Sequence, residues 1–541
     1  MAEKRQKEGK RSPKKRAQKS RSQAVDSGPP MGRATVPPAL NDPKQRLEWK
    51  LPKSKTKPGP YMVELNLFYK GGLQEASRQF GELYTRVLGE KANARPPVPV
   101  SKTYYRCMMS VDEWRQLVKQ DEEDQEETGK VNAKERRDRV IYRIWPDFPV
   151  KALIDRSVAT VKADAAFRSY EATGSGIVWA VIDSGIDQHL HFGHEEKNAA
   201  FNTLLHDDVR ELHRDFTGDG KPTKESAGSA LTDRFGHGTH VAGIIAGGLG
   251  EKLEPGKDFV AYEKVFESTP SGEKVGEKFV ERPSSATPRF RGVAPKCKLI
   301  SLKVLDDDGN GRASNIMLAL EYIREELNHD PKIARVHGVN LSIGYEFDPE
   351  MFACGQSPLC VEVDRMVKSG VVVVVAAGNT GYGRVNALQR QTKVGISNTI
   401  NDPGNAALAI TVGATHREFP HTYGVSYFSS KGPTGDGRLK PDLVAPGERI
   451  TSCAAGKKLE IINNSGEAPD DRPAYVDDTG TSMAAPHVSG AIAAFLSIRR
   501  EFIQRPEEVK KIFLESATPL GRERYFEGHG LLDLMRAIQS V

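Results

Sequence analysis

From about residue 155 onward, short apolar runs bounded by glycine alternate with segments of helical periodicity. The apolar runs are GIVWAVIDSG, KLISLKVLD, HGVNLSIG, GVVVVVAAGN and ALAITVGA. Runs of this kind are typical of strands buried on both faces, which predicts a parallel sheet between helices. Functional groups in such an α/β fold belong at the carboxyl ends of the strands. We therefore predict one large α/β domain over residues 155–541.

A smaller patterned region precedes this domain. Strand-like segments (PYMVELNLFY, SKTYYRCMMS, RVIYRIWPDF) alternate with segments of helical spacing (LQEASRQFGELYTRVL, VDEWRQLVKQ). Two strand–helix units followed by a strand predict a small α+β domain over residues 58–150. Within it, residues 121–138 are almost wholly polar and predict a loose loop. A second polar stretch, residues 249–291, separates a helix from a strand of the large domain and predicts a surface insertion.

Residues 1–57 are rich in Lys, Arg, Pro and Ser, a composition that predicts a disordered basic tail. The first 24 residues hold ten Lys or Arg and two Glu, a charge of +8, whereas the whole chain carries +6, so the remainder carries −2 (+6 − 8). Any attraction to nucleic acid or to acidic membranes is therefore expected from the tail.

The sequence does not predict export or a membrane span. No apolar stretch of about 7–15 residues follows the N-terminal charges, as a secretory signal requires. The longest strongly apolar run, Val371 to Ala377, is much shorter than the roughly 20 residues of a membrane helix. Five cysteines are too few, and odd in number, for a disulfide framework. We expect a cytoplasmic protein.

Three segments place polar side chains at strand or helix ends. Asp183 directly follows the apolar run 178–182, His237 lies between two glycines at a helix start, and Ser482 begins the helical stretch GTSMAAPHVSG. Each alone has an ordinary structural explanation, such as a turn, a helix start or an N-cap. A metal site at His237 and His240 is not indicated, because no acidic residue of an H-E-x-x-H motif separates them.

The three segments together indicate serine acyl transfer, which needs a nucleophile, a base and a buried carboxylate. The chain order Asp, His, Ser is one of the known orders of this triad. VIDSGID, GHGTHVAG and GTSMAAPHVSG resemble the signature segments of the subtilisin family of serine peptidases, the subtilases or peptidase family S8. VNLSIG, VVVAAGN and FSSKGPTGDGRLKPDLVAPG are also similar to this family, and the resemblance covers about residues 155–541.

The resemblance implies a three-layer subtilisin-like fold and a serine endopeptidase. It implies that Asp183 orients His237, and that His237 takes a proton from Ser482 and later gives it to the leaving amine. Ser482 would attack the scissile carbonyl to form an acyl-enzyme. Asn379 in VVVAAGN matches the side-chain donor of the oxyanion hole.

The resemblance also implies where an extended substrate binds, as an added β-strand. The substrate-binding edges would be Ser342, Ile343 and Gly344 on one side, and Gly309, Asn310 and Gly311 on the other. The floor of the pocket for the P1 residue would fall near Asn401. Asn401 and Asp402 would make that floor polar, so we expect polar or basic P1 residues to be accepted.

No cofactor is expected for the chemistry. Many family members hold structural calcium after the His helix, but the insertion 249–291 occupies that region, so no calcium ligand can be assigned. DDDGNG, Asp306 to Gly311, resembles the start of an EF-hand loop, yet Met317 stands where a bidentate Glu is needed. A turn at the substrate edge is the favoured interpretation. Cys354 and Cys360 could pair, but a reducing compartment favours free thiols.

Residues 58–150 occupy the position of the family's propeptide. We expect them to assist folding and to inhibit the cleft until cleavage, with Asp121 to Asp138 as an exposed cleavage site. Two alternatives stay open: a peptidase fold that binds partners through its basic tail, and an enzyme that hydrolyses only esters. Ser482→Ala separates the first from catalysis, since binding would survive it.

Pro486 lies inside the helical stretch that carries Ser482. Proline lacks an N–H and is best tolerated in the first turn, where the donors have no helical partner. The helix is therefore predicted to begin at about Ser482, with its positive end beside the hydroxyl.

Overall fold

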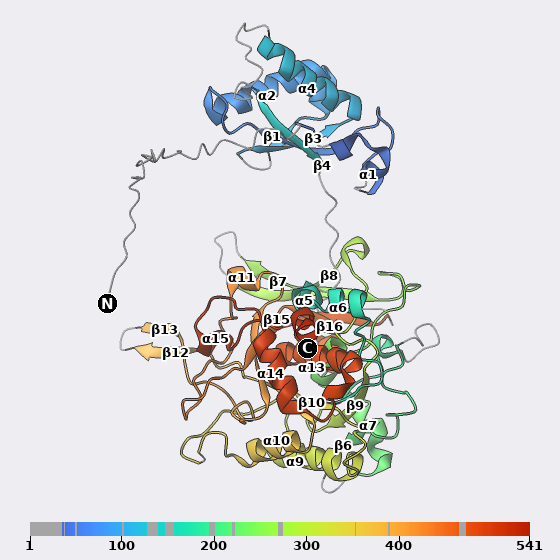
Figure 1. Cartoon of the computed structure of the whole chain (residues 1–541), viewed down its shortest axis with the longest axis vertical. Coiled ribbons are helices and arrows are strands. Elements are labelled where there is room, and N and C mark those ends of the chain that lie inside the picture. Colours follow the sequence, from blue (N-terminus) through green and yellow to red (C-terminus); the bar gives the residue numbers. More distant parts are fainter. Residues whose placement is uncertain are drawn as a thin grey trace, which may run out of the picture. The chain divides into compact units, whose positions relative to one another are not determined.

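The computed structural model describes residues 35–36, 38–48, 51–99, 102–126, 139–146, 156–193, 201–218, 222–268, 274–351, 353–387, 390–464 and 472–541. The chain divides into two compact units, Met1–Lys151 and Ala152–Val541, whose elements are labelled in Figure 1. The predicted tail over residues 1–34 lies outside the described residues.

The N-terminal unit is a four-stranded antiparallel sheet with helices on one face. Its strands follow the order β2-β3-β1-β4. The elements are β1 (Gly59–Leu65), α2 (Gly72–Leu88), α3 (Lys91–Ala94), β2 (Val98–Pro99), β3 (Tyr104–Met109), α4 (Val111–Glu126) and β4 (Ile141–Pro146). Tyr61 and Val63 alternate with half-buried residues along β1 and pack with Phe80 of α2 and Trp114 of α4. The two strand–helix units and the final strand predicted here are present.

This unit begins earlier than the expected boundary at residue 58. Residues 38–48 form η1 (Pro38–Asn41) and α1 (Pro43–Glu48), and Leu40 and Leu51 are buried in the same core. Arg46 is also fully buried, and its guanidinium donates to the carbonyls of Leu40, Pro52 and Lys53. The expectation of disorder was therefore wrong for the described part of residues 38–57. The composition is basic and rich in proline, but a few apolar side chains in this stretch are buried in the core.

Helix α4 extends into the segment predicted to be a loose loop. Asp121 is buried at its C-terminal half and accepts hydrogen bonds from the backbone N–H groups of Val140 and Ile141, at 3.1 and 3.0 Å. Burial raises the pKa of Asp121 to about 6. Residues 121–126 thus belong to helix α4, and Asp121 holds the start of β4 through these hydrogen bonds. Residues 127–138 lie outside the described residues.

A seven-stranded parallel sheet forms the centre of the C-terminal unit, in the order β15-β14-β11-β10-β5-β9-β6. The strands are β5 (Val178–Asp183), β6 (Arg214–Asp215), β9 (Lys298–Lys303), β10 (Gly338–Leu341), β11 (Val372–Ala376), β14 (Ile410–His416) and β15 (Leu443–Glu448). Trp179 and Val181 of β5 pack on one face with α8 (His237–Ile245) and α13 (Thr481–Ile498). Ala180 and Ile182 pack on the other face with α9 (Ala313–Glu321) and α10 (Pro358–Lys368). The predicted three-layer α/β fold is confirmed.

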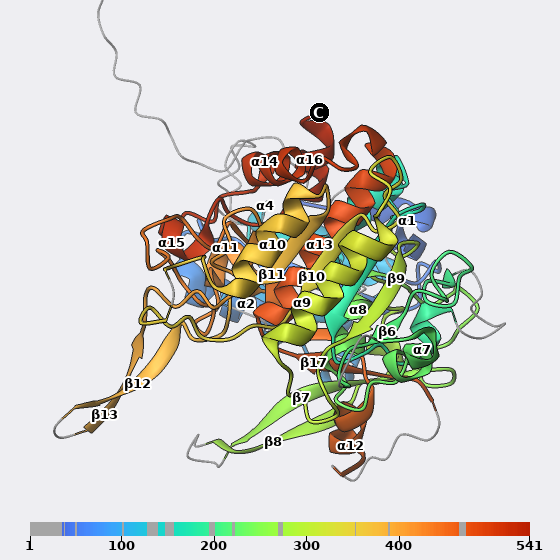
Figure 2. The ribbon, with the colours of Figure 1, turned by 90° about the horizontal axis from the view of Figure 1, so that it is seen from below.

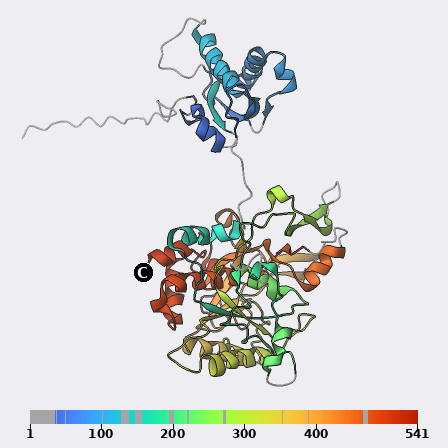
Figure 3. The same ribbon diagram turned by 90° about the vertical axis from the view of Figure 1, so that its right-hand side faces the viewer.

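The layers can be followed in the figures. Helices α9 and α10 lie side by side over the strands in Figure 2, and the view in Figure 3 separates these yellow helices from the red C-terminal helices. The remaining helices are α5 (Arg156–Thr160), α6 (Ala163–Tyr170), α7 (Ala227–Ala230), α11 (Pro420–Tyr423), α12 (Gly456–Asn464), α14 (Pro506–Ser516), α15 (Arg524–Glu527) and α16 (Leu534–Gln539). Short turns of helix are η3 (Leu190–Phe192), η5 (Lys224–Ser226), η6 (Ser284–Ala286), the π-helix η7 (Tyr322–Leu327) and η8 (Arg500–Phe502). A hairpin of β12 (Tyr382–Ala387) and β13 (Arg390–Gly395) projects from the body in Figure 2.

The insertion at residues 249–291 carries a hairpin, β7 (Val260–Ser268) and β8 (Lys274–Glu281). With β16 (Ile450–Cys453) and β17 (Ala474–Asp478) it forms a second sheet, in the order β16-β17-β7-β8. Strand β7 runs parallel to β17, and the run Phe259–Tyr262 is buried. The insertion is therefore partly integral to the fold, because its short apolar run FVAY pairs with a strand more than 200 residues later.

Among the described residues, α13 alone has the length and apolar composition that could cross a membrane. Within the C-terminal unit, 83% of that helix is buried, which is what the core helix of a globular domain shows.

Candidate active site

Asp183 and His237 meet at the carboxyl edge of the central sheet. Asp183 is the last residue of β5, and His237 is the first of α8. The Asp183 side chain is 1% exposed, and its Oδ1 lies 2.8 Å from Nδ1 of His237. The Ser184 N–H donates to the same oxygen at 2.8 Å. Because an ionised carboxylate only accepts, Nδ1 carries the proton and Nε2 is left as the basic nitrogen.

Two opposing influences act on the pKa of His237. Burial lowers it, because an imidazolium is poorly solvated there, but the charge and the hydrogen bond of Asp183 raise it. The net result is a pKa above the usual 6.5. His237 is therefore a stronger base than a free imidazole.

Asp233, which the motif comparison did not single out, organises the turn before His237. It is fully buried and accepts hydrogen bonds from the N–H of Gly236 at 2.7 Å and from the N–H of Thr239 at 2.8 Å. The hydroxyls of Ser184 and Thr239 donate to it as well, at 2.8 and 2.6 Å. Three of its four donors flank His237 in the chain, so Asp233 fixes the backbone from which the imidazole projects. The available signal was an acidic residue just before a helix start, which is typical of a cap.

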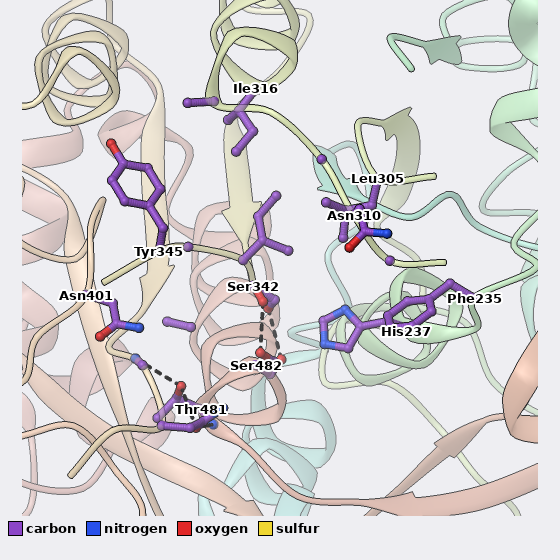
Figure 4. A pocket seen from close by; sticks show the side chains of 18 of the residues that line it. Phe235, His237, Leu305, Asn310, Ile316, Ser342, Tyr345, Asn401, Thr481 and Ser482 are labelled. Carbon is purple, nitrogen blue, oxygen red and sulfur yellow. Dashed lines mark hydrogen bonds between the residues drawn. The ribbon is translucent and has the colours of Figure 1, made fainter. Parts of the chain in front are cut away.

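Ser482 is held by a reciprocal pair of hydrogen bonds with Ser342. The Ser482 hydroxyl donates to the Ser342 carbonyl at 2.8 Å, and the Ser342 hydroxyl donates to the Ser482 carbonyl at 2.9 Å. Figure 4 shows the two serines joined by these bonds, with the ring of His237 beside Ser482. In this arrangement the hydroxyl donates to the strand edge, and among the described residues no hydrogen bond joins it to His237.

The same pair explains Pro486. Helix α13 begins at Thr481, one residue before the predicted start, so Pro486 is its sixth residue and lies beyond the first turn. The prediction that proline must stand among unpartnered donors was wrong in this respect. Pro486 cannot donate to the Ser482 carbonyl four residues earlier. The Ser342 hydroxyl satisfies that carbonyl instead.

Asn379 follows β11 and faces the start of α13. Its Oδ1 accepts from the N–H and the hydroxyl of Thr481, at 2.9 and 3.1 Å. The Thr481 hydroxyl in turn accepts from the Gly378 N–H at 3.1 Å. These contacts fix the orientation of the amide, so Nδ2 is its donor end, which has no hydrogen-bond partner in the part of the chain that the structure describes. Thr481 is thus a second residue of the site that sequence reasoning missed, since a threonine before a serine carries no signal of its own.

These groups border a cavity of about 570 Å³. Among its lining residues are Phe235, His237, Gly309, Asn310, Gly311, Ile316, Ser342, Ile343, Gly344, Tyr345, Asn379, Thr380, Asn401, Thr481 and Ser482. Every residue expected to bind substrate lines this cavity. Asp183 does not, since it lies behind His237.

The turn Asp306–Gly311 forms one edge of the cavity. Asp306 accepts from the N–H groups of Asp308 and Asn310, at 2.9 and 2.8 Å, which uses its carboxylate to close the turn. Gly309 has a φ of 84°, and a Cβ there would lie 2.4 Å from the ring of Phe235. Nowhere in the described ranges do three or more His, Cys, Asp or Glu gather as a metal site would require. The geometry matches the interpretation of this segment as a turn.

Comparison with known proteins identifies the family. The model of the subtilase family, peptidase family S8, matches residues 174–531, about two thirds of the chain. The chain belongs to the subtilase family. It is 27% identical to the serine protease AprX of Bacillus subtilis strain 168 over 383 residues, covering 69% of this chain and 68% of AprX. It is 28% identical to subtilisin E of the same strain over 382 residues, covering 71% and 70%.

A further relative is pyrolysin of Pyrococcus furiosus, 30% identical over 349 residues. The match covers 56% of this chain and 21% of pyrolysin, so this subtilase spans about a fifth of that relative. The family and its relatives establish the enzyme class: this subtilase is a serine endopeptidase, a hydrolase.

Of the two residues expected to form the floor of the P1 pocket, Asn401 lies at the cavity and Asp402 does not. Asn401 lines the cavity, and its Oδ1 accepts from the Thr380 hydroxyl at 3.1 Å. Asp402 is buried and turned away, with Oδ1 accepting from the side chain of Asn405 at 2.8 Å. The prediction that Asp402 makes the floor polar was wrong, because successive residues of this extended segment point in opposite directions.

All five cysteines of the subtilase are unpaired. Cys360 is buried beside Asp402, and burial together with this carboxylate raises the pKa of its thiol. Cys354 is half-buried near Arg438, and its pKa is also raised, mainly by burial. Neither thiol is activated as a nucleophile, so both match the favoured interpretation as free thiols.

Proposed function

We propose that this subtilase hydrolyses peptide bonds through an acyl-enzyme on Ser482. His237 would accept the hydroxyl proton at Nε2 as Ser482 attacks the scissile carbonyl, and would then pass it to the leaving amine. Asp183 would hold the Nδ1–H tautomer and stabilise the imidazolium. The observation that supports this proposal best is the 2.8 Å bond between Asp183 and His237 beside a serine at a helix start.

The tetrahedral intermediate would be stabilised by donors at the start of α13. Nδ2 of Asn379 is the free end of an amide held by Thr481, and it supplies one donor for the developing oxyanion. The N–H of Ser482 supplies the second, at the positive end of a helix of 18 residues. A preorganised donor of this kind contributes a factor of roughly 10²–10³ in rate; the worked example of that magnitude is a donor of this same family.

We propose that the substrate binds in extended form between Ser342–Gly344 and Gly309–Gly311. The strand-like edge favours peptides over simple esters, because its backbone groups can pair with a peptide backbone. At the P1 pocket the amide of Asn401 offers a neutral polar group, and Asp402 does not reach the cavity. We therefore propose acceptance of polar P1 side chains, and no preference for basic ones.

Labelling with a fluorophosphonate probe tests the nucleophile. The full chain should be labelled, and Ser482→Ala should lose labelling and peptidase activity together. Ser497→Ala, on the same helix and half-buried away from the cavity, is the matched control and should keep both. Labelling that persists in Ser482→Ala would place the nucleophile elsewhere.

We further propose that the N-terminal unit is an intramolecular inhibitor and folding aid. One face of its sheet is covered by α2 and α4, whereas Met62, Tyr104, Met108 and Trp145 occupy the opposite face, on which the described part of the unit packs no helix. The strand registers place Glu64, Arg106 and Arg143 on the same face, so it is a mixed apolar and charged face, as protein contacts outside obligate interfaces commonly are. Self-cleavage at the expected site, Asp121 to Asp138, should occur in the active chain and not in Ser482→Ala, as N-terminal sequencing would reveal. A fully active, uncleaved chain would contradict this part.

A further inference from the structure

Helix α12 begins directly against the turn that precedes His237. The Lys457 N–H donates to the Arg234 carbonyl at 2.9 Å. The backbones approach so closely that a Cβ on Gly236 would lie 2.2 Å from the Ala455 carbonyl, and one on Gly456 would lie 2.1 Å from that of Arg234. The start of α12 is therefore in backbone contact with the residues that carry the proposed base.

Two opposite charges from separate elements meet beside this contact. The Lys458 side chain passes Gly236, with its Cγ 3.3 Å from the position a Cβ would take there. Its Nζ bonds to Oδ2 of Asp478, the last residue of β17 and four residues before Ser482. Asp478 also accepts from the Thr479 N–H at 2.7 Å. The side chains are only 19% and 30% exposed, so solvent screens this pair incompletely.

We propose that the Lys458–Asp478 ion pair is a positioning element for His237, which sets the pH at which the imidazole is free to act as a base. This inference rests on the proposed function, in which His237 is that base. The reason is that the two opposite charges of the pair act on the pKa of His237 in opposite directions. Asp478 alone would stabilise the imidazolium and raise the pH at which the base loses its proton, and Lys458 counteracts it.

The direction of each effect follows from the sign of the charge. Lys458 lowers the pKa of His237, whereas Asp478 raises it. Both influences are smaller than those of burial and of the adjoining Asp183. Removing one partner leaves the other uncompensated, so the two single substitutions should act in opposite directions.

The remaining charged or titratable groups on the surrounding elements are neutral, bound to other partners or exposed to solvent. His240 on α8 is fully buried, and burial lowers its pKa to about 3, so it is neutral. Most of the other carboxylates are paired with cations or with backbone N–H groups: Asp477 with Arg282 and Arg417, Asp307 with Arg234 and Lys303, Asp308 with Lys457, Asp306 with its own turn, and Asp233 with the turn before His237. Glu460 on α12 is exposed, so solvent screens its charge.

The test is the pH dependence of kcat/KM for an uncharged peptide, measured beside the rate of fluorophosphonate labelling, in the full chain. Activity falls at acid pH as His237 protonates. Lys458→Met should move this acid limb to higher pH, and Asp478→Asn should move it to lower pH. Each shift should be roughly 0.3–1 pH unit, below the roughly 1–3 units produced by a charge in direct contact. The double substitution should restore a limb close to that of the original protein.

Matched controls separate charge from structure. Lys457→Met removes the same charge from the neighbouring position, where the side chain binds Asp308 instead, and should leave the limb in place. Lys458→Arg retains the charge and should also leave it in place. Should Asp478→Asn fail to fold, Lys458→Met compared with Lys457→Met decides the matter alone.

Each outcome has one meaning. Limbs that move in the same direction in both single variants, or that do not move, would overturn this inference. A double variant that keeps either shift would also overturn it. If the original protein is not labelled at all, the proposed function fails instead, so the two failures are distinguishable.

Discussion

Replacing Asp233 by alanine would remove the acceptor around which the turn before His237 is built. Four donors lose their partner: the N–H groups of Gly236 and Thr239, and the hydroxyls of Ser184 and Thr239. The hydroxyls can rotate toward other acceptors. The two backbone donors cannot, because the φ of 84° at Gly236 and the start of α8 fix their directions.

The magnitude follows from those two donors. A buried donor without a partner costs about 1–3 kcal/mol, which gives about 2–6 kcal/mol for the pair. Burial raises the pKa of Asp233 despite its hydrogen bonds, so holding the carboxylate ionised has a cost of its own. Because the substitution also removes the cost of the buried carboxylate, part of the loss is offset. We expect Asp233→Ala to lower the free energy of unfolding by about 3 kcal/mol. Misplacement of the His237 ring should lower kcat by about 10²-fold.

Urea unfolding followed by tryptophan fluorescence would measure the stability, in a Ser482→Ala background that prevents self-digestion. Peptide hydrolysis with Ser482 present would measure kcat. Asp233→Asn retains the shape of the side chain. Its NH₂ group would face only one of the two backbone N–H groups, so about half of the stability loss is expected. Asp330→Ala is the control, since this partly exposed residue also accepts a backbone N–H, at 2.9 Å, in a hydrogen bond that solvent reaches. It should change stability by less than about 0.5 kcal/mol.

The reasoning would be refuted if Asp233→Ala matched the stability of the Asp330→Ala control. It would be refuted equally by a stability loss without any loss of kcat, because the turn would then not position His237.

Three further predictions concern the same site. Asp183→Asn should lower the fluorophosphonate labelling rate by roughly 10⁴-fold, since an amide can hold the wrong tautomer of His237, and its residual acid limb should move to lower pH because the raising charge is lost. Asn379→Ala should lower kcat by roughly 10²–10³-fold with little change in KM, as steady-state hydrolysis would reveal. Gly309→Ala should raise KM, because its Cβ would fall 2.4 Å from an aromatic ring, whereas Gly437→Ala, with a similar φ of 85° and no atom within 4 Å, should leave KM unchanged.

The parts of the structure that the sequence predicts well are those with a local pattern. Runs such as GVVVVVAAGN can be satisfied only by a strand covered on both faces, so the central sheet follows directly from them. The segments around Asp183, His237 and Ser482 each combine a small-residue turn with one polar side chain. Such segments can be recognised from the local sequence alone, without knowing which residues they contact.

The parts that escaped prediction depend on partners distant in the chain. Strand β7 pairs with β17, and nothing in the composition of residues 249–291 indicates that partner. Arg46 belongs to a core because three carbonyls surround it, although its local composition is that of a solvated tail. The direction of Asp402 depends on which of two adjacent residues faces the cavity. A shift of one residue along an extended segment reverses that assignment.

The Ser342 hydroxyl donates to the Ser482 carbonyl, to which Pro486 cannot donate. This bond makes positions 342 and 486, which are 144 residues apart, interdependent. Alanine at position 486 would give α13 a new N–H donor and, by helix propensity alone, would count as an improvement of about 3 kcal/mol. That donor would compete with the Ser342 hydroxyl for its acceptor and loosen the substrate edge from the nucleophile. Position 486 is therefore a case of epistasis: what is tolerated there is decided by residue 342, and a consensus or stability design that treats the two positions separately would choose wrongly.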